Sequence, residues 1–170
     1  NALRIVLLLS FSILSLSYLY SSYFVLLKYE RSLEYGFPYI KLAEKSEELN
    51  SKKFMVDSGR QSQSYIWFAF FKKYDPNKLQ EQGKDVLNNY YNTSSFDGRR
   101  VIGNVEIRPN DWEKDPCTDQ IIVGDDLAIS ESQAKEHGLS LIFEIGDLSQ
   151  KYKLKAYATN PKKVCRLSDR

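Results

Sequence analysis

The sequence contains few of the residues that build catalytic and metal sites. Its 170 residues include one histidine, His137, and two cysteines, Cys117 and Cys165. A structural zinc site takes about four ligands, mostly cysteine or histidine, so we expect no metal and no cofactor. Glycine-rich phosphate loops, nucleophile elbows and the HExxH and CxxC motifs are also missing. These absences favour a protein that is not an enzyme.

An excess of charge of one sign is missing too. The 24 basic and 22 acidic residues leave a net charge of +2, and the two signs are interspersed along the chain. Nucleic-acid-binding surfaces carry clustered positive charge. We therefore expect no nucleic-acid partner.

Three polar features remain as candidate sites, and each has a simpler structural interpretation. His137 falls in the last turn of a predicted short helix, where a cation stabilises the helix dipole. Asp125 and Asp126 are adjacent, so their side chains point in different directions and indicate a turn. The alternating acidic run at 111–115 lacks the glycine and the final glutamate of a calcium loop. We expect structural roles for all three.

A long uncharged run opens the chain at residues 5–27. A helix of this length spans about 35 Å at about 1.5 Å per residue, enough to cross a hydrocarbon core of about 30 Å. A secretory signal usually has an apolar region of about 7–15 residues followed by a small-residue cleavage site, whereas this run ends in "YFVLL". We expect a retained, single-pass helix in the lipid bilayer.

Serine residues within this run suggest helix packing. Ser10, Ser17 and Ser21 fall on one stripe, and the last two form a small-xxx-small pair that lets helices approach closely. A serine hydroxyl is also satisfied by the carbonyl four residues back. Two interpretations stay open: a helix that packs against its own copies or against other membrane subunits, and a somewhat polar anchor.

The membrane run leads into an amphipathic stretch that reaches Phe54. Gly36, Phe37 and Pro38 interrupt it, and proline inside a helix removes a hydrogen bond, so we expect a break near 36–38. The chain then divides into a membrane and assembly helix at residues 1–54 and a globular domain at residues 55–170.

The globular part predicts helices first and strands later. The run "YIWFAFF" at 65–71 indicates buried core, and Asp75 with Pro76 indicates a helix start. A short helix is expected between 125 and 138, with a capping box and a glycine at its end. Alternating residues predict strands, of which 152–158 is the clearest, joined to its neighbour by a hairpin. The fold class is α+β, with an antiparallel sheet of about four strands at 100–108, 120–123, 139–145 and 152–158.

The two cysteines both follow the membrane run. Outside the cytoplasm they would form a disulfide, which closes a loop of about 49 residues and contributes about 4 kcal/mol in the chain-entropy account. The alternative is two reduced, buried thiols. We place the domain in the periplasm or outside the cell on this ground. Asn92 begins an N-glycosylation sequon. Trp112, between Pro109 and Pro116, is either an exposed binding residue or part of the packing of the disulfide loop.

This layout resembles type IV pilins and pseudopilins. The matching parts are the apolar run at 5–27, the helix to Phe54, and the ending "YKLKAYATNPKKVCRL", which looks like the last strand and cysteine of some minor pilins. A start at Asn1, a few residues before the apolar run, would fit removal of a leader. The resemblance implies a cell-surface filament built on the first helix. The family usually has glutamate at the fifth position, where this chain has Ile5.

Two other classes share the same order of elements. One is a single-pass extracytoplasmic subunit of a membrane secretion complex. The other is a membrane-tethered domain that binds a protein, such as an immunity protein. All three classes are structural or binding proteins, and all use residues 1–54 to reach the membrane.

Overall fold

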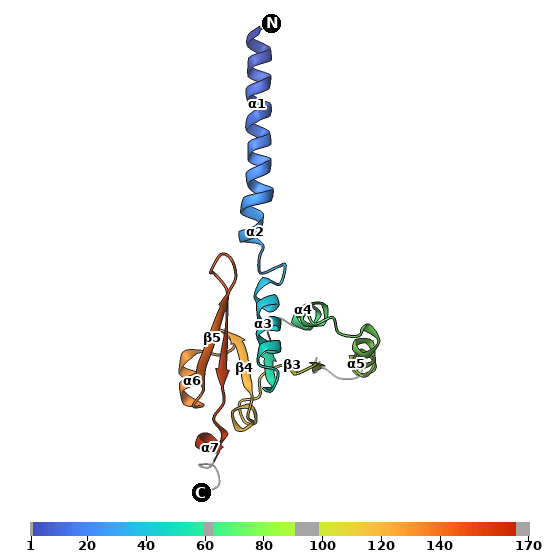
Figure 1. Ribbon diagram of the computed structural model, residues 1–170, viewed down its shortest axis with the longest axis vertical. Helices are drawn as coiled ribbons and strands as arrows, with labels where there is room; N and C mark the ends of the chain where they lie inside the picture. Colours follow the sequence, from blue (N-terminus) through green and yellow to red (C-terminus); the bar gives the residue numbers. More distant parts are fainter. Residues whose placement is uncertain (1, 60–62, 91–98, 166–170) are drawn as a thin grey trace.

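A long apolar helix projects from an α+β domain in the computed structural model (Figure 1), which describes residues 2–59, 63–90 and 99–165, with the backbone alone at 85–90 and 163. The helix, here called the stalk, extends over Ala2–Glu30 as α1 (Ala2–Tyr20), a π-helical turn η1 (Ser21–Leu26) and α2 (Leu27–Glu30). None of its side chains is buried. It is long and apolar enough to cross a membrane, a property that signal sequences share.

A hydrogen-bonded turn at residues 31–36 separates the stalk from the domain. Gly36 has a φ of +71°, a left-handed conformation that glycine adopts without steric cost. Helix α3 (Phe37–Glu48) begins directly after it with Pro38 in its first turn, where proline is well tolerated. The predicted break is therefore confirmed. Pro38 starts a new helix, and this helix stops short of Phe54.

The described residues form one mixed sheet of six strands in the order β2-β3-β1-β4-β6-β5. The central strand β1 runs parallel to β3 and β4, and the remaining pairs are antiparallel. The prediction of about four antiparallel strands was therefore wrong in number and in direction. The strands are β1 (Phe54–Asp57), β2 (Arg100–Ile102), β3 (Val105–Arg108), β4 (Ile121–Asp125), β5 (Ser140–Gly146) and β6 (Lys153–Ala158).

Side chains pack on both faces of this sheet. Helices α3 and α4 (Ser64–Phe71) cover one face, over a core that includes Phe54, Phe68 and Ile107. The opposite face carries a smaller cluster around Ile122, under α6 (Glu131–Glu136). This second layer explains why Tyr157, which lies on the same face of β6 as the charged Lys153 and Lys155, is only 4% exposed.

Local signals at helix ends are confirmed. Helix α5 (Pro76–Tyr90) starts after Asp75, whose Oδ1 accepts a hydrogen bond from the Asn77 N–H at 2.9 Å. Ser130 and Gln133 form the capping box of α6, and Gly138, with a φ of +61°, follows its end. The hairpin between β5 and β6 is present as well. Asn92 lies outside the described residues.

The disulfide between Cys117 and Cys165 is confirmed, with a Cα–Cα distance of 5.7 Å. Cys117 ends the short 3-10 helix η2 (Asp115–Cys117), and Cys165 follows α7 (Pro161–Val164). The bond therefore ties the C-terminal segment to the loop that precedes β4.

Candidate functional site

The stalk is the first region with functional potential, because it is apolar and none of its side chains is buried. Ser10, Ser17 and Ser21 are all exposed. The Ser17 hydroxyl donates to the Ile13 carbonyl at 2.8 Å, as expected for a serine that needs no partner in lipid. A shallow groove runs beside Ser17 and Ser21, flanked by Tyr20 among others. The packing role of the three serines stays a prediction.

The π-helical turn η1 begins at Ser21. The helix leaves regular α-helical geometry here, because the Leu27 N–H donates to the Ser22 carbonyl, five residues back instead of four. Single π-turns inside α-helices occur frequently at functional positions. The irregularity therefore coincides with the end of the serine stripe.

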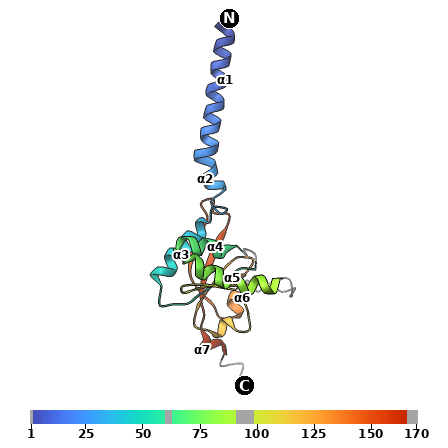
Figure 2. The same ribbon diagram turned by 90° about the vertical axis from the view of Figure 1, so that its right-hand side faces the viewer.

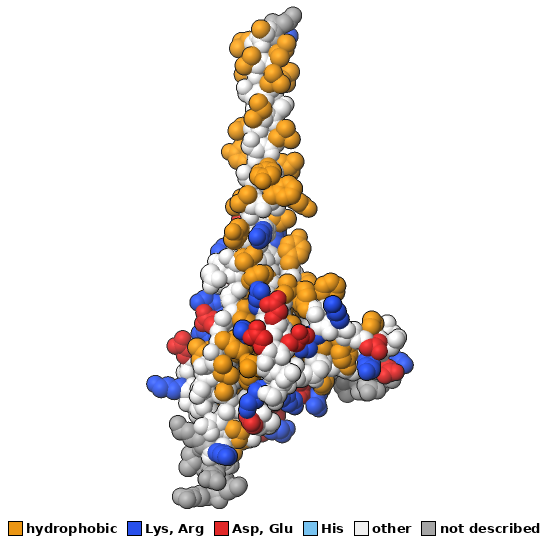
Figure 3. Space-filling view, in the orientation of Figure 1, with side chains coloured by type: hydrophobic (Ala, Val, Ile, Leu, Met, Phe, Trp, Pro, Cys, Tyr) orange, Lys and Arg blue, Asp and Glu red, His pale blue; other side chains and the backbone are white. Residues whose placement is uncertain are grey.

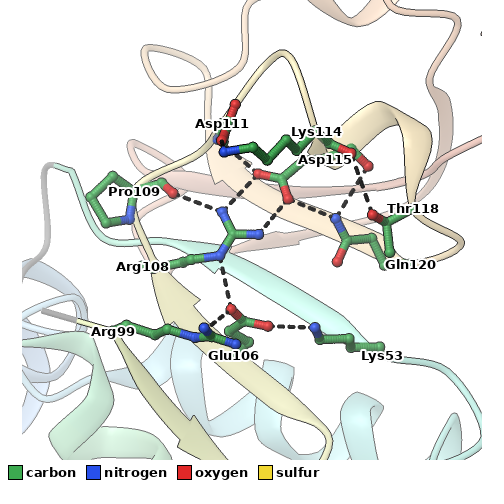
Figure 4. A pocket seen from close by; sticks show the side chains of 10 residues that line it. All are labelled: Lys53, Arg99, Glu106, Arg108, Pro109, Asp111, Lys114, Asp115, Thr118 and Gln120. Carbon is green, nitrogen blue, oxygen red and sulfur yellow. Dashed lines mark hydrogen bonds and ion pairs between the residues drawn. The ribbon is translucent and has the colours of Figure 1, made fainter. Parts of the chain in front are cut away.

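A charged pocket of about 610 Å³ is the second region (Figure 4). It lies on the sheet face opposite α3. Glu106 and Gln120 alternate with core residues along β3 and before β4, so their side chains point to this side. The lining residues are Lys53, Arg99, Glu106, Arg108, Pro109, Asp111, Lys114, Asp115, Thr118 and Gln120.

Glu106 is the centre of the charged pocket. Its side chain is 3% exposed and pairs with three cations. Lys53 Nζ lies 2.5 Å from Oε2, and the Nε atoms of Arg99 and Arg108 each lie 2.9 Å from Oε1. Burial alone would raise the pKa of Glu106, but the hydrogen bonds from Lys53 and Arg108 bring it below the usual value. This carboxylate is therefore ionised at neutral pH.

Asp115 forms the other half of the network. Both of its oxygens accept hydrogen bonds from the Arg108 guanidinium, Oδ2 at 2.8 Å. The Asp111 N–H and the Gln120 amide donate to it as well, at 2.7 and 2.9 Å. Burial would raise the pKa of Asp115, and these bonds, with Arg108 first, lower it below the usual value. The hydrogen bond to Asp115 in turn raises the pKa of Arg108.

In this geometry the charged residues of the pocket hold a loop against the sheet, an arrangement here called the clamp. Arg108, at the end of β3, holds the loop at 109–120 through Asp115, and Gln120 connects the same loop to the start of β4. All three lining carboxylates pair with cations, Asp111 with Lys114 at 3.1 Å. General acid–base catalysis needs a group whose pKa lies near the working pH, and none of these carboxylates is shifted in that direction.

The polar residues considered as candidate sites in the sequence make contacts that stabilise the fold. His137 lies at the end of α6 and stacks on Trp112, with ring centroids 4.5 Å apart. Asp125 Oδ1 accepts the N–H groups of Leu127 and Ala128, which confirms the turn. Within the described ranges, no group of three or more His, Cys, Asp or Glu residues is placed to hold a metal.

The sequence interpretation missed Glu106, Arg108 and Gln120. A signal was present in "VEIR", where Glu106 and Arg108 alternate with two apolar residues and so share one face of a strand. The signal says that this face is polar. It does not say that the face is buried, because that depends on the loop at 109–120 folding back over it.

Comparison with known proteins finds no family model that matches the chain, and no match among curated proteins or solved structures. The likeness to pilins therefore consists of the layout alone, a long apolar helix followed by an α+β body. Function has to be argued from the stalk and from the domain.

Proposed function

We propose that this chain is a non-enzymatic subunit of a membrane assembly. A single helix anchors it, and its disulfide-bonded domain lies outside the cytoplasm. One observation carries the proposal: the stalk has no buried side chain and stands away from the domain (Figure 3). Exposing this much apolar surface to water is unfavourable by about 25 cal/mol per Å². A bilayer, with or without partner helices, removes that cost.

The disulfide supports the orientation. Disulfides persist in oxidising compartments and are rare in the cytosol. The Cys117–Cys165 bond is part of the folded domain, so the domain side of the membrane is the periplasm or the cell exterior. The stalk then reaches towards the cytoplasm with Arg4 near its start.

An anchored subunit fits the structure better than a pilin-like filament subunit. In the pilin layout one continuous helix runs from the membrane into the domain, under an antiparallel sheet. Here the turn at 31–36 ends the stalk, so that α3 packs on the sheet and the stalk does not, and the sheet is mixed. A filament built on the stalk remains the second candidate, because the Ser17 and Ser21 stripe would suit a polymer core as well as a membrane complex.

Cross-linking in native membranes tests the proposal. A Ser17→Cys chain should form cross-links with its own copies or with an unlike chain, whereas Ser12→Cys, on another side of the helix, should form few. The native cysteines are joined to each other, so only the new thiol reacts. Equal cross-linking at both positions, or none, would contradict a specific packing role. Recovery of the chain in sheared, detergent-free filaments would favour the pilin-like alternative.

A further inference from the structure

Helix α4 has an apolar face that the domain leaves uncovered. Phe68 and Ala69 pack into the core, as the sequence predicts for this run, but Ile66 is 47% exposed and Phe70 is 73% exposed. Residues four apart lie on the same side of a helix. Ile66 and Phe70 therefore form one outward face, here called the α4 face.

The α4 face lies at the end of the domain from which the stalk rises. Figure 2 shows α4 in the part of the domain nearest the end of α2, and Figure 1 shows it beside the upper part of α3. Trp67 of α4 lies against Gly36, the last residue of the turn below the stalk. A Cβ atom on Gly36 would come within 2.5 Å of the Trp67 ring. Trp67 also stacks on Phe71.

Apolar surface continues from the stalk onto this end of the domain. Figure 3 shows hydrophobic side chains along the stalk and again in the region of α4, below and to the right of the base of the stalk. Tyr29 and Tyr35, at the junction, are 49% and 60% exposed. Tyrosine and tryptophan are enriched where a membrane meets water, because one end of the ring is apolar and the other polar.

The length of the stalk puts the junction at the membrane surface. Its 29 residues extend about 44 Å at about 1.5 Å per residue. A bilayer is about 40–45 Å thick with its headgroups. If the stalk spans the bilayer, its last turn therefore lies at the surface of the lipid headgroups. Only the short turn at 31–36 separates that turn from the domain.

We propose that the α4 face inserts into the headgroup boundary of the bilayer that the stalk crosses. Ile66 and Phe70 enter the headgroup layer, while Lys73, exposed just after α4, meets lipid phosphates. Short apolar faces bind membranes in this manner when a second anchor holds them there. The domain then lies on the membrane instead of turning freely about the stalk. This inference depends on the proposed membrane span.

Quenching of a single fluorescent label in lipid nanodiscs tests the inference. The full chain carries Phe70→Cys with an NBD label, one chain per disc, in phosphatidylcholine and phosphatidylglycerol. Leu141→Cys is the matched control. Leu141 is also exposed and apolar, but it lies near the start of β5, about 17 Å along the strand from Gly146. The hairpin after Gly146 reaches the junction, where Leu148 N–H donates to Ser32 Oγ at 3.1 Å.

The inference predicts that lipids with a nitroxide on the headgroup quench the label at position 70, and that aqueous iodide quenches it much less than at position 141. Equal iodide quenching at both positions would overturn it. Shielding of position 70 that arises only with two chains per disc would also overturn it, in favour of contact between copies. A third label, Leu9→Cys in the stalk, separates the two claims. If iodide reached position 9, the membrane span itself would be wrong.

Discussion

The ring of Trp67 lies directly against the backbone of Gly36, which has a φ of +71°. This contact joins helix α4 to the turn between the stalk and the domain. The position needs glycine for two reasons: the backbone is left-handed, and a side chain would occupy the space of the indole. The orientation of the domain relative to the stalk therefore depends on a residue without a side chain.

Gly36→Ala should destabilise the domain and displace Trp67. A left-handed backbone costs a residue with a Cβ about 1–2 kcal/mol, and the clash with the indole adds to this. We expect a lower melting temperature and a red-shifted tryptophan emission, measured on the full chain in detergent. Gly59→Ala is the control, because the nearest atom to its added Cβ is 3.4 Å away. Equal effects at the two glycines would contradict the account of the junction.

Asp115→Asn should be strongly destabilising, because Asp115 is buried and the change leaves the half-buried guanidinium of Arg108 without its main charged partner. Breaking a buried ion pair from one side typically costs about 3–5 kcal/mol. Chemical denaturation at neutral pH measures the loss. Asp119→Asn makes the same chemical change at an exposed carboxylate that pairs with Lys52, where surface pairs contribute about 0–1 kcal/mol. A loss of less than about 1 kcal/mol in the free energy of unfolding of Asp115→Asn would show that the clamp does not stabilise the domain.

The stability of the domain should decline in acid. The pKa values of Glu106 and Asp115 are lower in the folded protein than in the unfolded chain, so the folded state binds fewer protons. Their contribution is fully present above the unfolded pKa of about 4 and is lost as the pH falls through the lower folded values. We expect a free energy of unfolding that falls below about pH 4, with a shallower fall in Asp115→Asn. A parallel decline in both proteins would contradict this assignment.

Replacing Cys117 and Cys165 together by serine should lower the free energy of unfolding by about 4 kcal/mol. Reductant should lower the melting temperature of the natural chain and leave that of the double variant unchanged. If reductant had no effect on the natural chain, the disulfide would contribute nothing to its stability.

Ser17→Leu and Ser21→Leu together should weaken assembly while the domain stays folded. The larger side chains fill the stripe where helices would approach closely. Native gel electrophoresis of solubilised membranes reports the size of the assembly. The matched control is Ser12→Leu with Ser15→Leu, which adds the same apolar volume away from the stripe. Unchanged assembly in the stripe variant would leave the serines as parts of a polar anchor.

Most local features followed from the sequence, because their causes lie within a few residues. The start of α5 at Asp75 and the capping box at Ser130 depend on neighbouring atoms. Strand β1 was missed because its partners β3 and β4 follow about 50 residues or more later, and its buried residues do not alternate. The charged pocket was missed for the same reason. The pairing of Glu106 with Lys53 requires the parallel register of β1 and β3.

Protease digestion of sealed, right-side-out membrane vesicles tests the central claim most directly. The vesicles come from cells that express the full chain with a tag on each end. An anchored subunit with an external domain predicts that added protease removes the domain, and that a fragment containing the stalk stays in the membrane after alkaline carbonate washing. A domain protected until the vesicles are opened, or a chain released whole by carbonate, would contradict the account.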